Sequence, residues 1–201
     1  MNIFKLHEQK PVRLGHKKAN NDKKSKMEEK GQLNLFEKKP AKIFSIDKKL
    51  SAFEQAFVFD ENGDTQAREL YLKAIEENDC SADSYCNLGI LEAHDSNYVK
   101  AIDYFSHALA IEPRHFEAHF NLANLYFDNE DLNLARLHYE MALKIDPDDA
   151  NIYFNLGLVQ VMQNDIDGAI QSFTTYLSMA GDQEALKTRV LLNQLTESRK
   201  V

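Results

Sequence analysis

Apolar residues recur along this chain with the spacing of helices that bury one face. Between Ala101 and Leu109 they fall at positions 101, 102, 105, 108 and 109, the pattern of an amphipathic helix. The stretch from Tyr85 to Leu91 predicts another helix shortly before it, with Gly89 near its middle. A glycine inside a helix costs roughly 1 kcal/mol relative to alanine, so we expect a second helix backbone to pack closely there. The pattern predicts a hairpin of two packed helices.

The same pattern returns every 34 residues. Five columns keep this step: Ala67, Ala101, Ala135 and Ala169; Tyr71, Phe105, Tyr139 and Phe173; Ala74, Ala108, Ala142 and Tyr176; Ile75, Leu109, Leu143 and Leu177; and Leu88, Leu122 and Leu156. Pro113 and Pro147 keep it too, and a proline ends a helix. A period of this length is typical of an array of helical hairpins. We therefore expect an all-α fold.

Three consecutive segments resemble the tetratricopeptide repeat. They are NLGILEAHDSNYVKAIDYFSHALAIEP, NLANLYFDNEDLNLARLHYEMALKIDP and NLGLVQVMQNDIDGAIQSFTTYLSMAG. The family's pattern is an aromatic, Leu-Gly, a Tyr, an Ala, an aromatic, a second Ala and a Pro. The resemblance implies a right-handed superhelical stack of antiparallel helical hairpins, with repeats at residues 82–115, 116–149 and 150–183.

Atypical elements are expected at both ends of the array. Residues 48–81 read as a divergent repeat that keeps only its second half, in Ala67, Tyr71 and Ala74. Residues 184–198 have spaced apolar residues between charges and predict a capping helix, because an open stack must end in a half-polar element to stay soluble.

The resemblance also implies a binding site, because the family usually presents the first helix of each hairpin on the concave side. The residues expected in this groove are Asn87, Ile90, Phe120, Asn121, Asn124, Phe127, Phe154, Asn155 and Leu158. Asn87, Asn121 and Asn155 lie one repeat apart and could bond the backbone of a peptide. Each neutral hydrogen bond nets only about 0.5–1.5 kcal/mol, so apolar anchors must supply most of the affinity. We expect an extended or helical peptide of a protein partner, although the same aromatics could pack on the chain's own tail or on a second copy.

The family's carboxylate clamp, which holds the C-termini of chaperones, is disfavoured. It needs Lys and Arg at several groove positions to pair with a terminal carboxylate. Here Cys86, Asn151 and Asn155 stand at those positions.

Charge divides the chain into a basic tail and an acidic body. Residues 1–44 hold 12 Lys plus Arg against 5 Asp plus Glu, and the remainder holds 12 against 27. The tail has no sustained periodicity and is predicted to be disordered. Such charge is usually solvated, but it could touch nucleic acid, an anionic membrane or the acidic body. Nucleic acid is unlikely to be a partner, since no arginine or aromatic is interleaved among Lys17, Lys18, Lys23, Lys24 and Lys26.

One short motif lies in this tail. Gln32, Leu33, Leu35 and Phe36, in the string QLNLF, resemble the bacterial sliding-clamp-binding motif. The resemblance implies a tether to the DNA replication clamp as an alternative function. The string could equally arise by chance or fold back on the repeat groove.

No catalytic or metal-binding pattern is present, so we expect neither an enzyme, nor a cofactor, nor a small-molecule substrate. His115 and His119 could share a helix face but have no evident third ligand, and we expect a surface pair without metal. Cys80 and Cys86 form no disulfide framework. No apolar run is long enough for a secretory signal or a membrane span, so a cytoplasmic location is expected.

Overall fold

The computed structural model describes residues 50–180 and 182–199, and every regular element in these ranges is a helix. The helices are α2 (Ala52–Glu61), α3 (Gln66–Glu76), α4 (Ser81–His94), α5 (Tyr98–Ile111), α6 (Phe116–Asp128), α7 (Leu132–Ile145), α8 (Ala150–Met162), α9 (Ile166–Met179) and α10 (Asp182–Ser198). The tail at 1–44 and its QLNLF motif lie outside the described residues.

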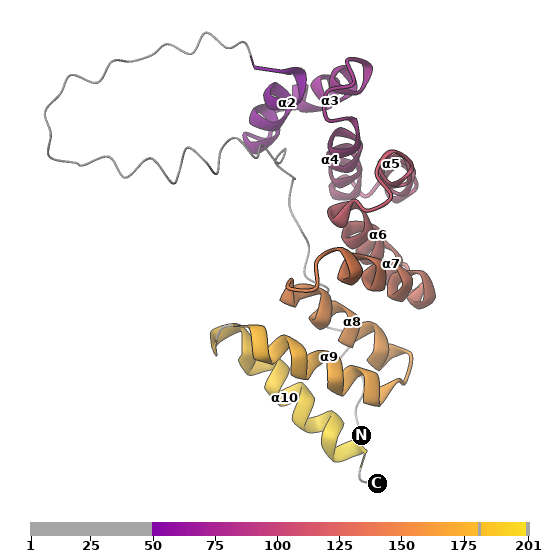
Figure 1. Ribbon diagram of the computed structural model, residues 1–201, viewed down its shortest axis with the longest axis vertical. Helices are drawn as coiled ribbons and strands as arrows, with labels where there is room; N and C mark the ends of the chain where they lie inside the picture. Colours follow the sequence, from indigo (N-terminus) through magenta and orange to yellow (C-terminus); the bar gives the residue numbers. More distant parts are fainter. Residues whose placement is uncertain (1–49, 181, 200–201) are drawn as a thin grey trace, which may run out of the picture.

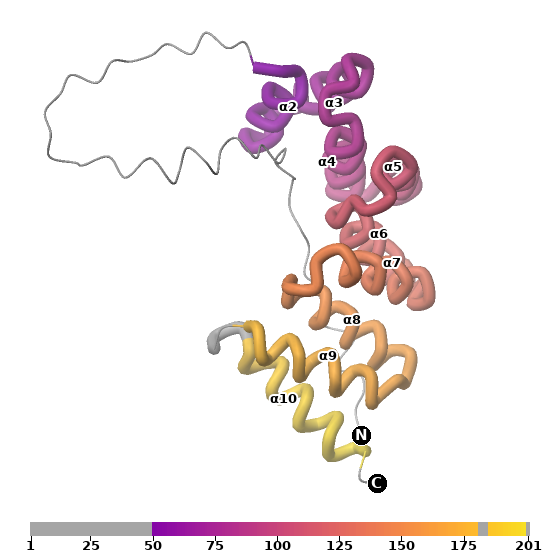
Figure 2. The backbone as a smooth tube through the Cα atoms, viewed as in Figure 1, coloured from indigo at the N-terminus to yellow at the C-terminus, as the bar shows by residue number. Residues whose placement is uncertain are grey.

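The helices form four antiparallel hairpins stacked in chain order (Figure 1). The pairs are α2–α3, α4–α5, α6–α7 and α8–α9, and α10 packs against α9 at the end of the stack. In Figure 1, α2, α4 and α6 lie on one side of the stack and α3, α5 and α7 on the other. The tube in Figure 2 bends along its length, so that the stack is curved. The predicted all-α hairpin solenoid with a capping helix is confirmed.

Local sequence signals set the ends of the helices. Ser51 and Glu54 form a capping box at the start of α2: the Ser51 hydroxyl accepts from the Glu54 N–H and the Glu54 carboxylate accepts from the Ser51 N–H. The carboxylates of Asp131 and Asp165 cap α7 and α9, each accepting from the backbone N–H three residues on. At the other end, α5 stops two residues before Pro113.

The glycine in the middle of α4 and of α8 makes room for an aromatic ring. A Cβ atom added to Gly89 would lie 2.7 Å from the Phe105 ring, and one added to Gly157 would lie 2.6 Å from the Phe173 ring. Both rings are fully buried. The expected close contact exists, and the atoms nearest to position 89 belong to a side chain of the second helix, the Phe105 ring.

The expected surface pair of histidines is also wrong, because His115 is fully buried and His119 is only 6% exposed. His115 caps the start of α6, where its Nδ1 accepts from the Ala118 N–H at 3.2 Å. Its Nε2 then carries the proton and donates to the Asp83 carboxylate of α4 at 3.1 Å. His115 is therefore a link between successive repeats.

His119 is buried against His138 of α7. The His119 Nε2 lies 3.1 Å from the Pro113 carbonyl, so it donates there, and its Nδ1 accepts from the His138 Nδ1, 2.9 Å away. This arrangement requires the His119 ring to be neutral. Burial lowers the pKa of His119, and burial together with the nearby His119 lowers the pKa of His138 to about 4.

We predict that Gly89→Ala lowers the free energy of unfolding by about 1 kcal/mol, measured by urea denaturation. Overpacking against Phe105 costs roughly 1–3 kcal/mol, while alanine regains roughly 1 kcal/mol of helix propensity. The same change in a Phe105→Leu background, which removes the ring, should be neutral or stabilising. An equal gain in stability in both backgrounds would show that the ring does not restrict position 89.

We predict that stability falls as the pH drops from about 6.5 towards 4. The folded pKa of His138 lies below its unfolded value, so protonation favours the unfolded chain. His138→Gln should reduce the loss of unfolding free energy between pH 7.5 and 5.0 by about 1 kcal/mol, after allowance for partial exposure. His107→Gln, on the exposed surface of α5, is the control. An identical pH dependence for wild type and His138→Gln would contradict the neutral pair.

Candidate functional site

On α4, α6 and α8, one helix face carries mostly polar side chains, although Ile90 and Leu158 on it belong to the apolar clusters of the stack. On α6, Ala118 and Leu122 pack towards α4 and α5, whereas Phe120 and Ala123 pack with α7 and α8. Glu117, Asn121, Asn124 and Asp128 of α6 belong to neither cluster; they are four, three and four residues apart and share one face. With their equivalents on α4 and α8 they form what we call the first-helix stripe: Asp83, Asn87, Ile90 and His94; Glu117, Asn121, Asn124 and Asp128; Asn151, Asn155, Leu158 and Met162.

Two amides in the middle of this stripe have unsatisfied donors. Asn121 is 7% exposed and Asn124 is 1% exposed, yet the Nδ2 of each has no hydrogen-bond partner in the described part of the chain. The orientation of Asn124 is fixed, because its Oδ1 accepts from the Tyr139 hydroxyl and from the Asn155 Nδ2. Leaving a buried donor unpaired costs roughly 1–3 kcal/mol, and most buried polar groups are paired. These two donors are therefore exceptions to the usual pairing of buried polar groups.

Asn87 and Asn155, the other members of the predicted ladder, join successive repeats. The Asn87 Nδ2 donates to the Tyr71 hydroxyl at 3.0 Å, and that hydroxyl donates to Asp60 at 3.0 Å. Burial raises the pKa of Tyr71, and the charge of Asp60 raises it further, so the hydroxyl keeps its proton. Asn155 donates to Asn124 at 3.3 Å. Sequence reasoning missed this role, although tyrosine at 71 and 139, where 105 and 173 are phenylalanine, was a usable signal.

The structure divides the predicted apolar anchors into buried and half-buried ones. Phe120 is fully buried, with its ring centroid 5.8 Å from that of Tyr139 in an edge-on contact, so it is a core residue and not an accessible anchor. Ile90 and Leu158 also belong to the apolar clusters. Phe127 and Phe154 are half-buried. These two aromatics remain available for contact with a ligand.

The first helices carry no cation. Between residues 50 and 180, every Lys and Arg lies on α3, α5, α7 or the turn before α6: Arg68, Lys73, Lys100, Arg114, Arg136 and Lys144. Arg68 pairs with Glu92 and Asp95, and Arg136 pairs with Asp165 of the next repeat at 3.1 Å. The stripe itself contains Asp83, Glu117 and Asp128. Its charge favours a cationic ligand and disfavours a carboxylate.

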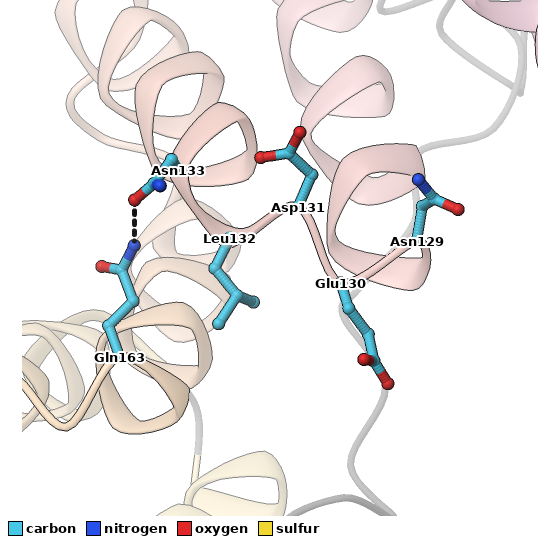
Figure 3. A pocket seen from close by; sticks show the side chains of 6 residues that line it. All are labelled: Asn129, Glu130, Asp131, Leu132, Asn133 and Gln163. Atoms are coloured by element: carbon cyan, nitrogen blue, oxygen red, sulfur yellow. Dashed lines mark hydrogen bonds between the residues drawn. The ribbon is translucent and has the colours of Figure 1, made fainter.

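A separate polar hollow lies at the α6–α7 turn and includes no residue of the stripe (Figure 3). It is lined by Asn129, Glu130, Asp131, Leu132, Asn133 and Gln163, and the Gln163 amide donates to the Asn133 Oδ1 at 3.1 Å. Across residues 50–180 and 182–199, no group of three or more His, Cys, Asp or Glu side chains could hold a metal ion. Nor is any helix there long and apolar enough to cross a membrane.

Comparison with known sequences identifies repeats in the same region. A model described as "TPR repeat" matches residues 123–164, and one described as "Tetratricopeptide repeat" matches residues 70–103 and 104–136. Human protein O-mannosyl-transferase TMTC3 is 34% identical over 102 residues, which are 49% of this chain and 11% of that protein. BBSome complex member BBS4 of Xenopus tropicalis is 30% identical over 88 residues, 44% of this chain and 17% of that protein. The matched segments are only a small part of these relatives.

Two solved structures share the fold at low sequence identity. MamA 41-end from Desulfovibrio magneticus RS-1 has a TM-score of 0.64 and 19% identity, covering 74% of this chain and 84% of that one. The first TPR of Spaghetti (RPAP3), bound to the HSP90 peptide SRMEEVD, has a TM-score of 0.55 and 15% identity, covering 60% and 94%. The repeats and the hairpin stack show that this chain belongs to the tetratricopeptide-repeat family, whose fold is that of protein-interaction scaffolds.

Proposed function

We propose that this chain is a non-catalytic scaffold whose first-helix stripe binds an extended segment of a partner protein. The observation that carries the proposal is the pair of buried, unpartnered amide donors of Asn121 and Asn124. A peptide carbonyl is the acceptor that would satisfy them. Most carbonyls of a helical ligand are already bonded within the helix, so an extended backbone fits these donors better.

The spacing of the two amide donors and the energies of the contacts also support binding of an extended peptide. Residues three apart on a helix are roughly 5–6 Å apart at their Cβ atoms, and carbonyls on one side of an extended chain are about 7 Å apart. Asn121 and Asn124 are three apart, so both can reach one ligand strand. Two such bonds net only about 1–3 kcal/mol, well below the roughly 8 kcal/mol of micromolar binding. Apolar ligand side chains against Phe127 and Phe154, at roughly 1.5–3 kcal/mol each when fully buried, must supply much of the rest.

The preferred ligand is basic and apolar. The RPAP3 repeat structure binds SRMEEVD, a peptide with two glutamates and a terminal aspartate. In this chain α2, α4, α6 and α8 hold no Lys or Arg that could pair with such groups. Asp83, Glu117 and Asp128 would instead repel them.

We predict that Asn121→Ala weakens peptide binding about five- to tenfold, because the variant loses one donor to the ligand backbone. The probe is the tightest peptide selected on the full chain from a displayed random library, with affinity measured by fluorescence polarisation. Asn121 is preferred to Asn124, which also holds Tyr139 and Asn155 in place. Circular dichroism would verify that the variant is folded.

Asn193→Ala, on the exposed surface of α10, is the matched control and should bind the same peptide as wild type does. The selected peptides should be rich in Lys, Leu and Phe, and SRMEEVD should not bind measurably. An unchanged Kd for Asn121→Ala, or a selection dominated by acidic peptides, would refute the proposed site.

A further inference from the structure

We infer that the first-helix stripe is also the docking site of this chain's own N-terminal segment, residues 31–44, which competes with partner peptides. The inference rests on the proposed function, because it assigns an occupant to the same stripe. Residues 31–44 read GQLNLFEKKPAKIF and lie outside the described part of the chain. Three features argue for this occupant: its charge, the order of its residues and its reach.

Charge complementarity favours this segment over an unrelated surface. Lys38, Lys39 and Lys42 outnumber the single carboxylate of Glu37. The first helices, by contrast, carry carboxylates and no cation. All cations between residues 50 and 180 lie elsewhere on the stack, so the stripe is the face on which these lysines meet no repulsion.

The order of residues in the segment matches the order of chemistry along the stripe. The chain enters the stack at α2, so a segment folding back passes α4 and α6 before it reaches α8. After Phe44 and Ile43, its lysines are the next residues on this path and would meet Asp83 and Glu117. Leu35 and Phe36 lie beyond the lysines and would reach the α8 end, where Met162 and Phe154 are half-buried.

The segment is long enough and is shaped for an extended path. Phe36 lies 14 residues before Leu50, and an extended chain spans about 3.3 Å per residue, or roughly 46 Å. Three steps between neighbouring first helices, from α2 to α8, cover about 30 Å at 8–10 Å each. A proline and the residue before it disfavour helical conformations, so the Lys39-Pro40 pair suits an extended path. The carbonyls of such a strand can accept from Asn121 and Asn124.

Because the segment is part of the same chain, even a weak contact is sufficient to keep it on the stripe most of the time. A short flexible linker gives an effective concentration on the order of 1 mM. A segment with a Kd of about 0.1 mM as a free peptide would then occupy the stripe about nine-tenths of the time. A partner peptide would bind about tenfold more weakly than to an open stripe.

The test uses the full chain with Phe36→p-benzoylphenylalanine, a photoreactive residue, and maps the crosslinks by mass spectrometry. We expect the main crosslinks in α6 and α8. Lys38→Glu/Lys39→Glu/Lys42→Glu should reduce their yield at least fivefold. Lys17→Glu/Lys18→Glu/Lys23→Glu, which changes the charge of the tail equally, should change the yield less than twofold.

Crosslinks mainly on α3, α5 or α7, no dominant site, or an equal effect of both charge reversals would overturn the inference. A mixture of isotopically light and heavy chains separates the two sources of the segment: crosslinks that join light to heavy chains would show a second copy in the stripe and overturn docking within one chain.

The same charge-reversed variants separate this inference from the proposed function. If the segment docks, Lys38→Glu/Lys39→Glu/Lys42→Glu should bind the selected library peptide about tenfold more tightly than wild type does. If that peptide binds all variants equally and depends on Asn121, the proposed function stands and only the intramolecular occupant is wrong. If no library peptide binds even the charge-reversed variant, the proposed function fails.

Discussion

The structure depends on one contact that recurs within the hairpins, between an aromatic ring of the second helix and a small residue of the first. Phe105 lies on Gly89 and Phe173 lies on Gly157, with no space for another carbon atom. In the α6–α7 hairpin, which lies between these two, the equivalent residues Ala123 and Tyr139 belong to one apolar cluster. Because this contact fixes how the first helix is rotated, it also fixes which face of that helix is left outside the core. The surface that we propose as the binding site is thus a consequence of core packing.

The ring contact is similar in successive repeats, whereas the side chains on the uncovered face of the first helix differ from one repeat to the next. Along the first-helix stripe, the α4 and α6 portions carry Asp83, Glu117 and Asp128, whereas the α8 portion carries none of these charges and ends in Leu158 and Met162. The unsatisfied amides of Asn121 and Asn124 lie between the two ends. A ligand that bound this surface would have one orientation, with its cations at the α4 and α6 portions and its apolar groups at the α8 portion.

The sequence was sufficient to predict the hairpins, because their helices repeat every 34 residues and end at caps and prolines that are local signals. The site was harder to predict, since accessibility depends on contacts between repeats. Phe120 looked like an anchor but packs against Tyr139, and His115 looked exposed but lies between α4 and α6. The double role of the asparagines, as links between repeats and as donors, was likewise invisible until Tyr71 and Tyr139 were placed.

The central claim is that the amides of Asn121 and Asn124 donate to the main chain of an extended ligand. The most direct measurement is the ¹H–¹⁵N NMR spectrum of the full chain, labelled at asparagine, during titration with a selected basic peptide. The account predicts downfield shifts and slower solvent exchange for the side-chain NH₂ protons of these two residues, with Asn193 unchanged. Saturating binding that leaves both NH₂ groups unshifted would contradict it.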